Sequence, residues 1–286
     1  MTTTIRSQSP KSFSWRSAVR AKHIALPSEH GAWVFLLSPL AIGLAAGGVR
    51  PASLLLFVAA MAAFLIRQPV TMAVKVISGR RSKGELANIV FWLGLYGLIG
   101  LAATGALVGL GFGYLFWLAV PAAPVFVWHL WLVSRRAERR QMLVEIVAAG
   151  VLALAAPAAF WVGRGQVDPT GWLLWALSWL QIAGTILYAY LRLEQRQLKQ
   201  QPDRSTALRM ARPALLYNTL AFVLVAGLAI GRIVPALLPL AYLIQPVETA
   251  WGALKPAVGV KPTIIGIRQL VISVLFTVVF ILCWSL

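Results

Sequence analysis

The chain has 286 residues, of which 59% are hydrophobic and 12% are charged, and its mean hydropathy is +0.79. Soluble domains carry about 25% charged residues, so this composition excludes a soluble globular domain and indicates an integral membrane protein. The formal net charge is +18. With three histidines and one cysteine, the chain has little material for a disulfide framework or a transition-metal site, and we predict no bound metal.

The N-terminal residues 1–25 are rich in Ser, Thr, Arg and Lys and contain no acidic residue. We expect them to form a basic, flexible cytoplasmic tail that lies on anionic headgroups. Residues 26–286 are expected to form a single transmembrane helical domain, because they contain repeated apolar runs of about 18 to 23 residues, each long enough to cross the bilayer as a helix. The predicted fold class is therefore all-α, a polytopic bundle of about nine transmembrane helices.

The predicted spans follow one another as helical hairpins. They cover residues 31–48, 52–73, 88–108, 114–133, 142–162, 171–191, 213–230, 233–249 and 264–285. Short turns rich in Gly and Pro separate the spans at one end of each hairpin, and basic connections separate them at the other. The longest hydrophilic stretch between spans is 192–212, where we expect a protein partner to bind if the protein is part of a larger assembly.

The distribution of Lys and Arg predicts the orientation, because these residues are retained on the cytoplasmic side. With the N-terminus inside, 23 of the 26 Lys and Arg residues lie on that side, and the exceptions are Arg50, Arg164 and Arg232. We therefore predict a multi-pass protein of the bacterial cytoplasmic (inner) membrane with its N-terminus inside and its C-terminus outside. Since topology accounts for the basic charge, the expected partners are membrane lipids, and we predict no nucleic acid.

Ionisable side chains inside a span or at its edge are costly, so they mark candidate sites. Glu29 and His30 lie just before the first span. Arg67-Gln68-Pro69 interrupts the second span, and Lys75 follows about two turns later on a similar face. Two interpretations of Arg67 stay open: a structural salt bridge, with Glu29 or Glu145 as candidate partners, and a contact with a ligand.

The later spans add polar residues close to their predicted cytoplasmic ends. These are Glu145, Tyr188, Arg192, Asn218, Gln245, Glu248, Arg268 and Gln269, of which Gln245 and Glu248 are expected to end the eighth span. Topology places all of them at one membrane face, where they can share a site with the earlier groups. By contrast, the small residues Gly43, Gly47 and Ala102 to Gly111 are typical of close helix packing rather than chemistry.

The stretch Pro27-Ser28-Glu29-His30-Gly31-Ala32-Trp33, with Arg67-Gln68-Pro69, resembles the YwiC-like family of bacterial membrane proteins over most of the chain. More distantly, nine helices with Tyr188-Ala189-Tyr190 ending the sixth span are similar to the UbiA-type intramembrane prenyltransferases. That resemblance implies a UbiA-like bundle that binds a prenyl diphosphate through magnesium and Asp-rich motifs. Residues 67–86 contain no aspartate here, so we predict no cofactor and keep magnesium as the open alternative.

The leading hypothesis is a cytoplasm-facing cationic pocket for an amphiphilic anion, such as an isoprenoid diphosphate, a quinone precursor or a lipid headgroup. The predicted substrate-binding residues are Arg67, Gln68, Lys75, Tyr188, Arg192, Asn218 and Arg268. If the protein is an enzyme, we expect group transfer to or from a lipid, with Glu29, His30 and Glu145 in catalytic roles and His30 as general base. A small-anion transporter and a non-catalytic membrane subunit or assembly factor are the alternatives.

Overall fold

The computed structural model describes residues 22–27, 30–135 and 141–286, and within these ranges the fold is all-α. The helices are α2 (Lys22–Ala25), α3 (His30–Gly47), α4 (Pro51–Ile77), η1 (Lys83–Glu85), α5 (Leu86–Gly109), η2 (Gly113–Leu118), α6 (Ala119–Ser134), α7 (Met142–Leu152), α8 (Ala155–Arg164), α9 (Pro169–Gln195), α10 (Arg204–Ile230), α11 (Pro239–Leu254) and α12 (Pro262–Ser285). Every predicted span therefore contains a helix.

Seven of the described segments are long and apolar enough to cross a membrane: α4, η1 with α5, η2 with α6, α7 with α8, α9, α10 and α12. The apolar part of α3 is shorter, and α11 has 16 residues. The protein is thus a polytopic helical bundle with seven candidate spans. The count of nine spans, which adds α3 and α11, stays a prediction.

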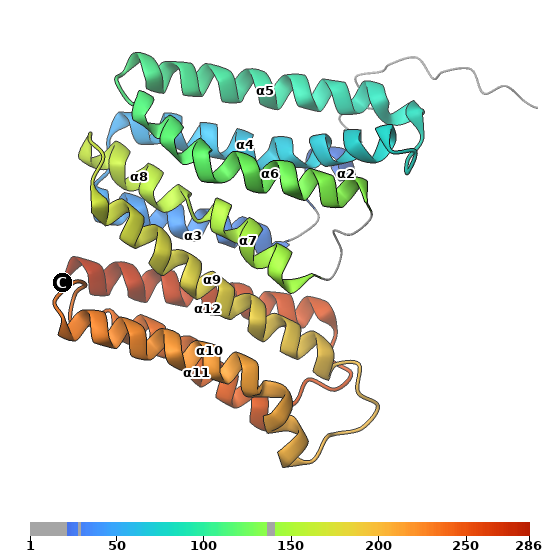
Figure 1. The fold of residues 1–286 in the computed structure, drawn as a ribbon, viewed down its shortest axis with the longest axis vertical. Helices are drawn as coiled ribbons and strands as arrows, with labels where there is room; N and C mark the ends of the chain where they lie inside the picture. The colour runs from blue at the N-terminus through green and yellow to red at the C-terminus, as the bar shows by residue number, and fades with distance from the viewer. Residues whose placement is uncertain (1–21, 28–29, 136–140) are drawn as a thin grey trace, which may run out of the picture.

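Long helices lie side by side across the whole bundle (Figure 1). Helices α4, α5 and α6 form one edge, α10 and α11 form the other, and α3, α7, α8, α9 and α12 lie between them. Successive helices run in opposite directions, so the connections 78–85, 196–203 and 255–261 share one end, which we call the basic end. The predicted orientation would place this end in the cytoplasm.

Helices α3 and α8 pack with almost no space between their backbones. A Cβ added at Gly43 would lie 2.2 Å from the carbonyl oxygen of Ala156, and one at Gly47 would lie 2.5 Å from that of Phe160. Only glycine permits this approach, and such contacts are a main source of helix association where apolar burial against lipid provides no driving force. The packing role predicted for Gly43 and Gly47 is confirmed. It is wrong for the glycines of the stretch Ala102 to Gly111, because nothing lies within 4 Å of a Cβ added at Gly105, Gly109 or Gly111.

The predicted fifth span, 142–162, is a broken helix. At the break between α7 and α8 the amide of Leu154 donates to the carbonyl of Val151, three residues earlier, instead of to that of Gly150. The indole of Trp175 in α9 donates to the Gly150 oxygen at 2.8 Å. A neighbouring helix therefore satisfies the carbonyl that the break leaves free, as the bilayer interior requires.

The predicted eighth span, 233–249, is wrong in position, because α11 runs from Pro239 to Leu254. Residues 231–238 form turns rather than helix, and Pro235 and Pro239 lack the amide hydrogens that would extend a helix toward its N-terminus. The shift has a consequence for the site. Glu248, expected at the end of a span, lies six residues before Leu254, or about 9 Å inside the helix.

Most of the hydrophilic stretch 192–212 is helical, because α9 continues to Gln195 and α10 begins at Arg204 and continues through Pro213. Asp203 caps the helix by accepting hydrogen bonds from the amides of Ser205 at 3.1 Å and Thr206 at 3.3 Å. Hydrogen bonds from Ser205 and then Thr206 lower the pKa of Asp203 to about 2. The stabilising effect of this cap is therefore present above about pH 4 and is lost as the pH falls through about 2.

Residues 22–25, the last part of the predicted tail, form the short helix α2 against α4 and α5. Ile24 is fully buried with Met72, Val76 and Ile89. The Gln68 amide donates to the carbonyl of His23 at 2.9 Å, and the Tyr96 hydroxyl donates to that of Ala25 at 3.0 Å. Gln68, predicted to bind substrate, thus helps hold α2 in place.

Replacing Gly43 with Leu tests the close packing of α3 on α8. We expect the substitution to force the helices apart and to lower the free energy of unfolding by about 1–3 kcal/mol, as is typical of overpacking. A lower midpoint temperature of thermal unfolding in detergent would show this loss. Gly105→Leu is the matched control, because nothing lies within 4 Å of a Cβ added there. Equal effects of the two substitutions would contradict the packing role.

Candidate functional site

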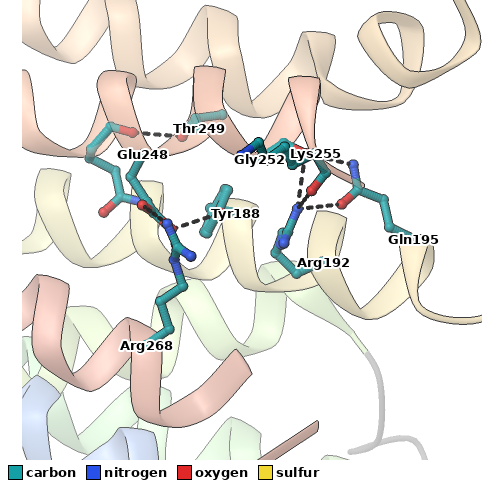
Figure 2. Close-up of polar contacts among 9 residues, drawn as sticks. Tyr188, Arg192, Gln195, Glu248, Thr249, Gly252, Lys255 and Arg268 are labelled. Carbon is teal, nitrogen blue, oxygen red and sulfur yellow. Dashed lines mark hydrogen bonds and ion pairs between the residues drawn. The ribbon is translucent and has the colours of Figure 1, made fainter. Parts of the chain in front are cut away.

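An ion pair joins α11 and α12 near the basic end. The Arg268 guanidinium donates from Nε to Glu248 Oε1 at 2.5 Å and from Nη2 to Oε2 at 2.8 Å (Figure 2). The Glu248 side chain is 6% exposed, and that of Arg268 is 39% exposed. Arg268 lies six residues after Pro262, so both charges are about two turns from the helix ends. A buried carboxylate persists only when its oxygens accept hydrogen bonds, and the two-pronged contact with Arg268 provides them.

Tyr188 connects α9 to this ion pair. Its hydroxyl donates to Glu248 Oε1 at 2.8 Å, and its side chain is fully buried (Figure 2). The ring lies against Gly252, where an added Cβ would come within 2.6 Å of the ring. Three helices therefore fix the Glu248 carboxylate: α11 carries it, and α9 and α12 supply its hydrogen-bond donors.

Arg192 is a buried cation, one turn after Tyr188 on α9. Its Nη1 donates to Gln195 Oε1 at 2.9 Å and to the carbonyl oxygens of Gly252 at 2.9 Å and Lys255 at 2.8 Å (Figure 2). These carbonyls belong to the C-terminal end of α11, whose partial negative charge favours a cation. Among the described residues, every acceptor that Arg192 contacts is neutral.

Trp251 lies at the centre of the positive charges. The Arg268 guanidinium carbon is 3.6 Å from the centroid of its ring, that of Arg192 is 5.5 Å away, and Lys255 Nζ is 5.8 Å away. The face of an indole ring attracts cations, and more so where water is excluded. We call Tyr188, Arg192, Glu248, Trp251 and Arg268 the Trp251 cluster.

A cavity of about 140 Å³ adjoins the Trp251 cluster. Tyr188, Arg192, Trp251, Arg268 and Gln269 line it together with Val260, Ile264 and Ile265, and nearly all of the lining surface is apolar. Two of the lining residues are cations, and of these Arg268 is paired with Glu248. The cavity thus has an apolar surface beside one cation, Arg192, that hydrogen-bonds to no described carboxylate.

A hydrogen-bonded polar layer lies next to the cluster between α9, α10 and α11. Asn218 Nδ2 donates to Thr249 Oγ1 at 3.1 Å, Thr249 Oγ1 donates to the carbonyl of Gln245 at 2.7 Å, and Gln181 Nε2 contacts Gln245 Oε1 at 3.5 Å. All four side chains are less than 9% exposed. Asn218, predicted to bind substrate, therefore supports α11 beside the cluster.

The structure divides the predicted substrate-binding residues between two regions. It brings Tyr188, Arg192 and Arg268 together, with Asn218 nearby. Arg67, Gln68 and Lys75 lie on α4, which is at the opposite edge of the bundle from α11 (Figure 1). The Arg67 guanidinium is 5.4 Å from the Phe64 ring centroid. Ligand contacts by Arg67 and Lys75 stay predictions.

The predicted catalytic residues do not belong to the Trp251 cluster as far as they are described. Glu145 on α7 is exposed, and its Oε1 accepts a hydrogen bond from the Tyr190 hydroxyl at 2.7 Å. Glu29 lies outside the described residues, and for His30 only the backbone, at the start of α3, is described. The acid–base roles of these three residues stay predictions.

Sequence reasoning noted Glu248 at the end of the eighth span without assigning it to the site, and it missed Trp251. A signal for Glu248 existed: a carboxylate near the end of one predicted span faces Arg268 near the start of the next, across a short connection. Because the eighth span was placed too early, Glu248 was interpreted as a terminal residue. Trp251 gave no signal of its own, since a tryptophan near a membrane interface is usually an anchor.

Magnesium does not fit the donors of this cavity. Within the described residues, no group of three or more His, Cys, Asp or Glu lies close enough together to hold a metal ion. Glu248 alone offers a carboxylate here, and both of its oxygens already accept hydrogen bonds from Arg268. Magnesium prefers several oxygen ligands, whereas these cations suit direct contact with an anion.

Comparisons with known proteins give a family relationship and no activity. Residues 26–160 match the family described as "YwiC-like protein". A protein of Bacillus subtilis (strain 168), named "Uncharacterized protein YwiC", is 28% identical over 177 residues, which cover 60% of this chain and 68% of that protein. No solved structure matches the chain significantly. The family match ends within α8, so the Trp251 cluster lies outside the matched residues, and none of these matches supports the UbiA resemblance.

Substituting Glu248 tests whether its hydrogen bonds support the site. Glu248→Gln removes the charge that accepts from Arg268 and from the buried Tyr188 hydroxyl, and we expect a loss of roughly 1–3 kcal/mol of unfolding free energy. The same change at Glu85, which pairs with Arg81 on the partly exposed surface, should cost about 1 kcal/mol or less. Unfolding in mixed micelles measures both. Replacing both partners, with Glu248→Met and Arg268→Met, should recover most of the loss, and failure to do so would contradict this account.

Proposed function

We propose that this polytopic membrane protein, which matches the YwiC-like family over residues 26–160, binds an amphiphilic anion in the cavity beside the Trp251 cluster. The observation that carries the proposal is Arg192, a residue that is 6% exposed and whose described hydrogen-bond acceptors are all neutral. An isolated buried charge is costly, and one that lines a cavity in a membrane protein is by default part of a ligand site.

The donors of Arg192 are arranged to serve an anion. All three of its described hydrogen bonds use Nη1, so Nε and Nη2 have no hydrogen bond to a described residue. Arg268 reaches the same cavity while it is held by Glu248. Guanidinium groups bind phosphate and carboxylate oxygens through paired N–H bonds, so these two side chains form a clamp for such a group.

The size and apolar wall of the cavity support an amphiphile rather than a small inorganic ion. Pockets that enclose a drug-sized ligand measure roughly 300–1,000 Å³, and this one measures about 140 Å³. It therefore accommodates a headgroup, and the remainder of a larger ligand must extend outside it. Val260, Ile264 and Ile265 give that remainder an apolar exit, and the interior of the membrane is a suitable destination for a hydrocarbon chain.

The proposal is limited to anion binding at the basic end, which we place in the cytoplasm because of the distribution of Lys and Arg. The donor set favours direct contact between cations and the anion over the metal-assisted ionisation that the UbiA resemblance implied. Group transfer involving Glu29, His30 and Glu145, a small-anion transporter, and a protein partner at 192–212 stay as predictions from the sequence.

Binding of dodecyl phosphate to the purified protein, followed by native mass spectrometry, tests the proposal. We expect the wild-type protein to retain dodecyl phosphate and to discriminate against dodecyltrimethylammonium, which has the same chain and the opposite charge. Arg192→Gln should weaken binding of the phosphate about tenfold or more, because a hydrogen bond to a charged group contributes roughly 1.5–3 kcal/mol.

Arg209→Gln is the matched control, because Arg209 is an exposed arginine near the same end. Equal binding of the two probes by the wild-type protein would overturn the proposal without any variant. Equal loss of affinity in Arg192→Gln and Arg209→Gln would show that surface charge, rather than the cavity, attracts the ligand.

A further inference from the structure

Gln269 is the polar residue of the cavity wall whose hydrogen bonds are missing. It follows Arg268 on α12, is 8% exposed and lines the cavity beside Tyr188, Arg192 and Trp251. Both its Nε2 and its Oε1 are buried, and neither has a hydrogen-bond partner among the described residues. An amide that lacks both its donor and its acceptor bond in this position points to a ligand.

Leaving these atoms unpaired is costly. A buried donor or acceptor without a partner costs about 1–3 kcal/mol, and native proteins contain few of them. The other buried amides near the site, Gln181, Gln195 and Asn218, each make at least one side-chain hydrogen bond. Gln269 therefore differs from its neighbours in lacking both bonds while lying next to the two cations that clamp the anion.

The acceptor of Gln269, Oε1, indicates which chemical group a ligand must carry. Arg192 and Arg268 offer only donors to a ligand, and the Glu248 carboxylate is occupied by Arg268 and Tyr188. Oε1 of Gln269 is thus the unpaired acceptor at this wall, and because it is buried beneath the cavity surface, the Gln269 side chain must turn toward the cavity to meet a ligand. A fully ionised phosphate or carboxylate has only acceptors, so it can satisfy Nε2 and cannot satisfy Oε1. A hydroxyl group beside the anionic group can satisfy Oε1.

We propose, building on the function proposed above, that the ligand is an amphiphilic anion whose head also carries a hydroxyl group, as in a phosphoglycerol headgroup. The anionic oxygens bind Arg192 and Arg268, and the hydroxyl donates to Gln269 Oε1. Gln269 Nε2 donates to an oxygen of the same head. Gln269 then selects the type of head, whereas the arginines supply the attraction for negative charge.

Two probes with the same chain and the same charge isolate the hydroxyl. Dodecyl glyceryl phosphate and dodecyl methyl phosphate are both singly charged diesters, and the first adds hydroxyl groups. We expect the wild-type protein to bind the glyceryl ester about tenfold more tightly, because one hydrogen bond to a buried neutral group contributes roughly 0.5–1.5 kcal/mol and the hydroxyl also relieves an unpaired acceptor. The dissociation constants can be measured by native mass spectrometry.

Gln269→Leu should abolish the preference between the two probes, because the variant loses the amide and keeps the arginines. It should weaken binding of the glyceryl ester more than that of the methyl ester, because both esters lose the Nε2 hydrogen bond and only the glyceryl ester also loses the bond to Oε1. Gln197→Leu, at an exposed glutamine near the same end, is the control and should preserve the preference. The ratio in the wild-type protein tests the proposal even if Gln269→Leu does not fold.

The outcomes separate this inference from the function on which it rests. If neither ester binds the wild-type protein, the cavity does not hold an amphiphilic anion and both proposals fail. If both esters bind equally and Gln269→Leu changes neither affinity, anion binding stands and the hydroxyl requirement is wrong. If glycerol phosphate without a chain binds as tightly as the dodecyl ester, the ligand is a soluble anion and its amphiphilic character is wrong.

Discussion

The structure depends on the need to satisfy every polar group inside the protein where no water is available. Two features show this constraint most directly. At the break between α7 and α8, the Trp175 indole donates to the freed carbonyl of Gly150. Between α11 and α12, both oxygens of Glu248 are engaged by Arg268, and Tyr188 adds a third hydrogen bond. In each case α9 supplies a donor, so this helix connects the middle of the bundle to the site.

The same constraint gives the cavity its character, because the balance of charges and hydrogen bonds is incomplete there. Arg192 has only neutral acceptors among the described residues, and the Gln269 amide has none of its hydrogen bonds. Trp251 lowers the cost of gathering cations, since its ring faces Arg192, Lys255 and Arg268. An anionic head with a hydroxyl group would give Arg192 an anionic partner and the Gln269 amide its hydrogen bonds. Binding of such a ligand would therefore also stabilise this part of the bundle.

How far sequence reasoning succeeded differs from element to element. Apolar runs located the long helices of the bundle but not α2, and the small residues Gly43 and Gly47 correctly predicted close packing. The start of α11 was misplaced because residues 233–238 are largely apolar and were assigned to a membrane span, whereas the helix begins only at Pro239. The break inside residues 142–162 also escaped notice, since its freed carbonyl is satisfied by Trp175, a residue of another helix.

By itself, the sequence determined that the chain is a polytopic helical membrane protein, because hydropathy and length act on each segment separately. It also identified Tyr188, Arg192, Asn218 and Arg268 as polar groups in or near membrane spans, where burial is unfavourable, and therefore as candidates for a site. Only the tertiary structure decided which of these groups meet. It joined Arg268 to Glu248, placed Trp251 beneath three cations, and put Arg67 and Lys75 on a helix at the other edge of the bundle. Hydropathy carries no information about which helices are neighbours, and side-chain pairing depends on neighbours.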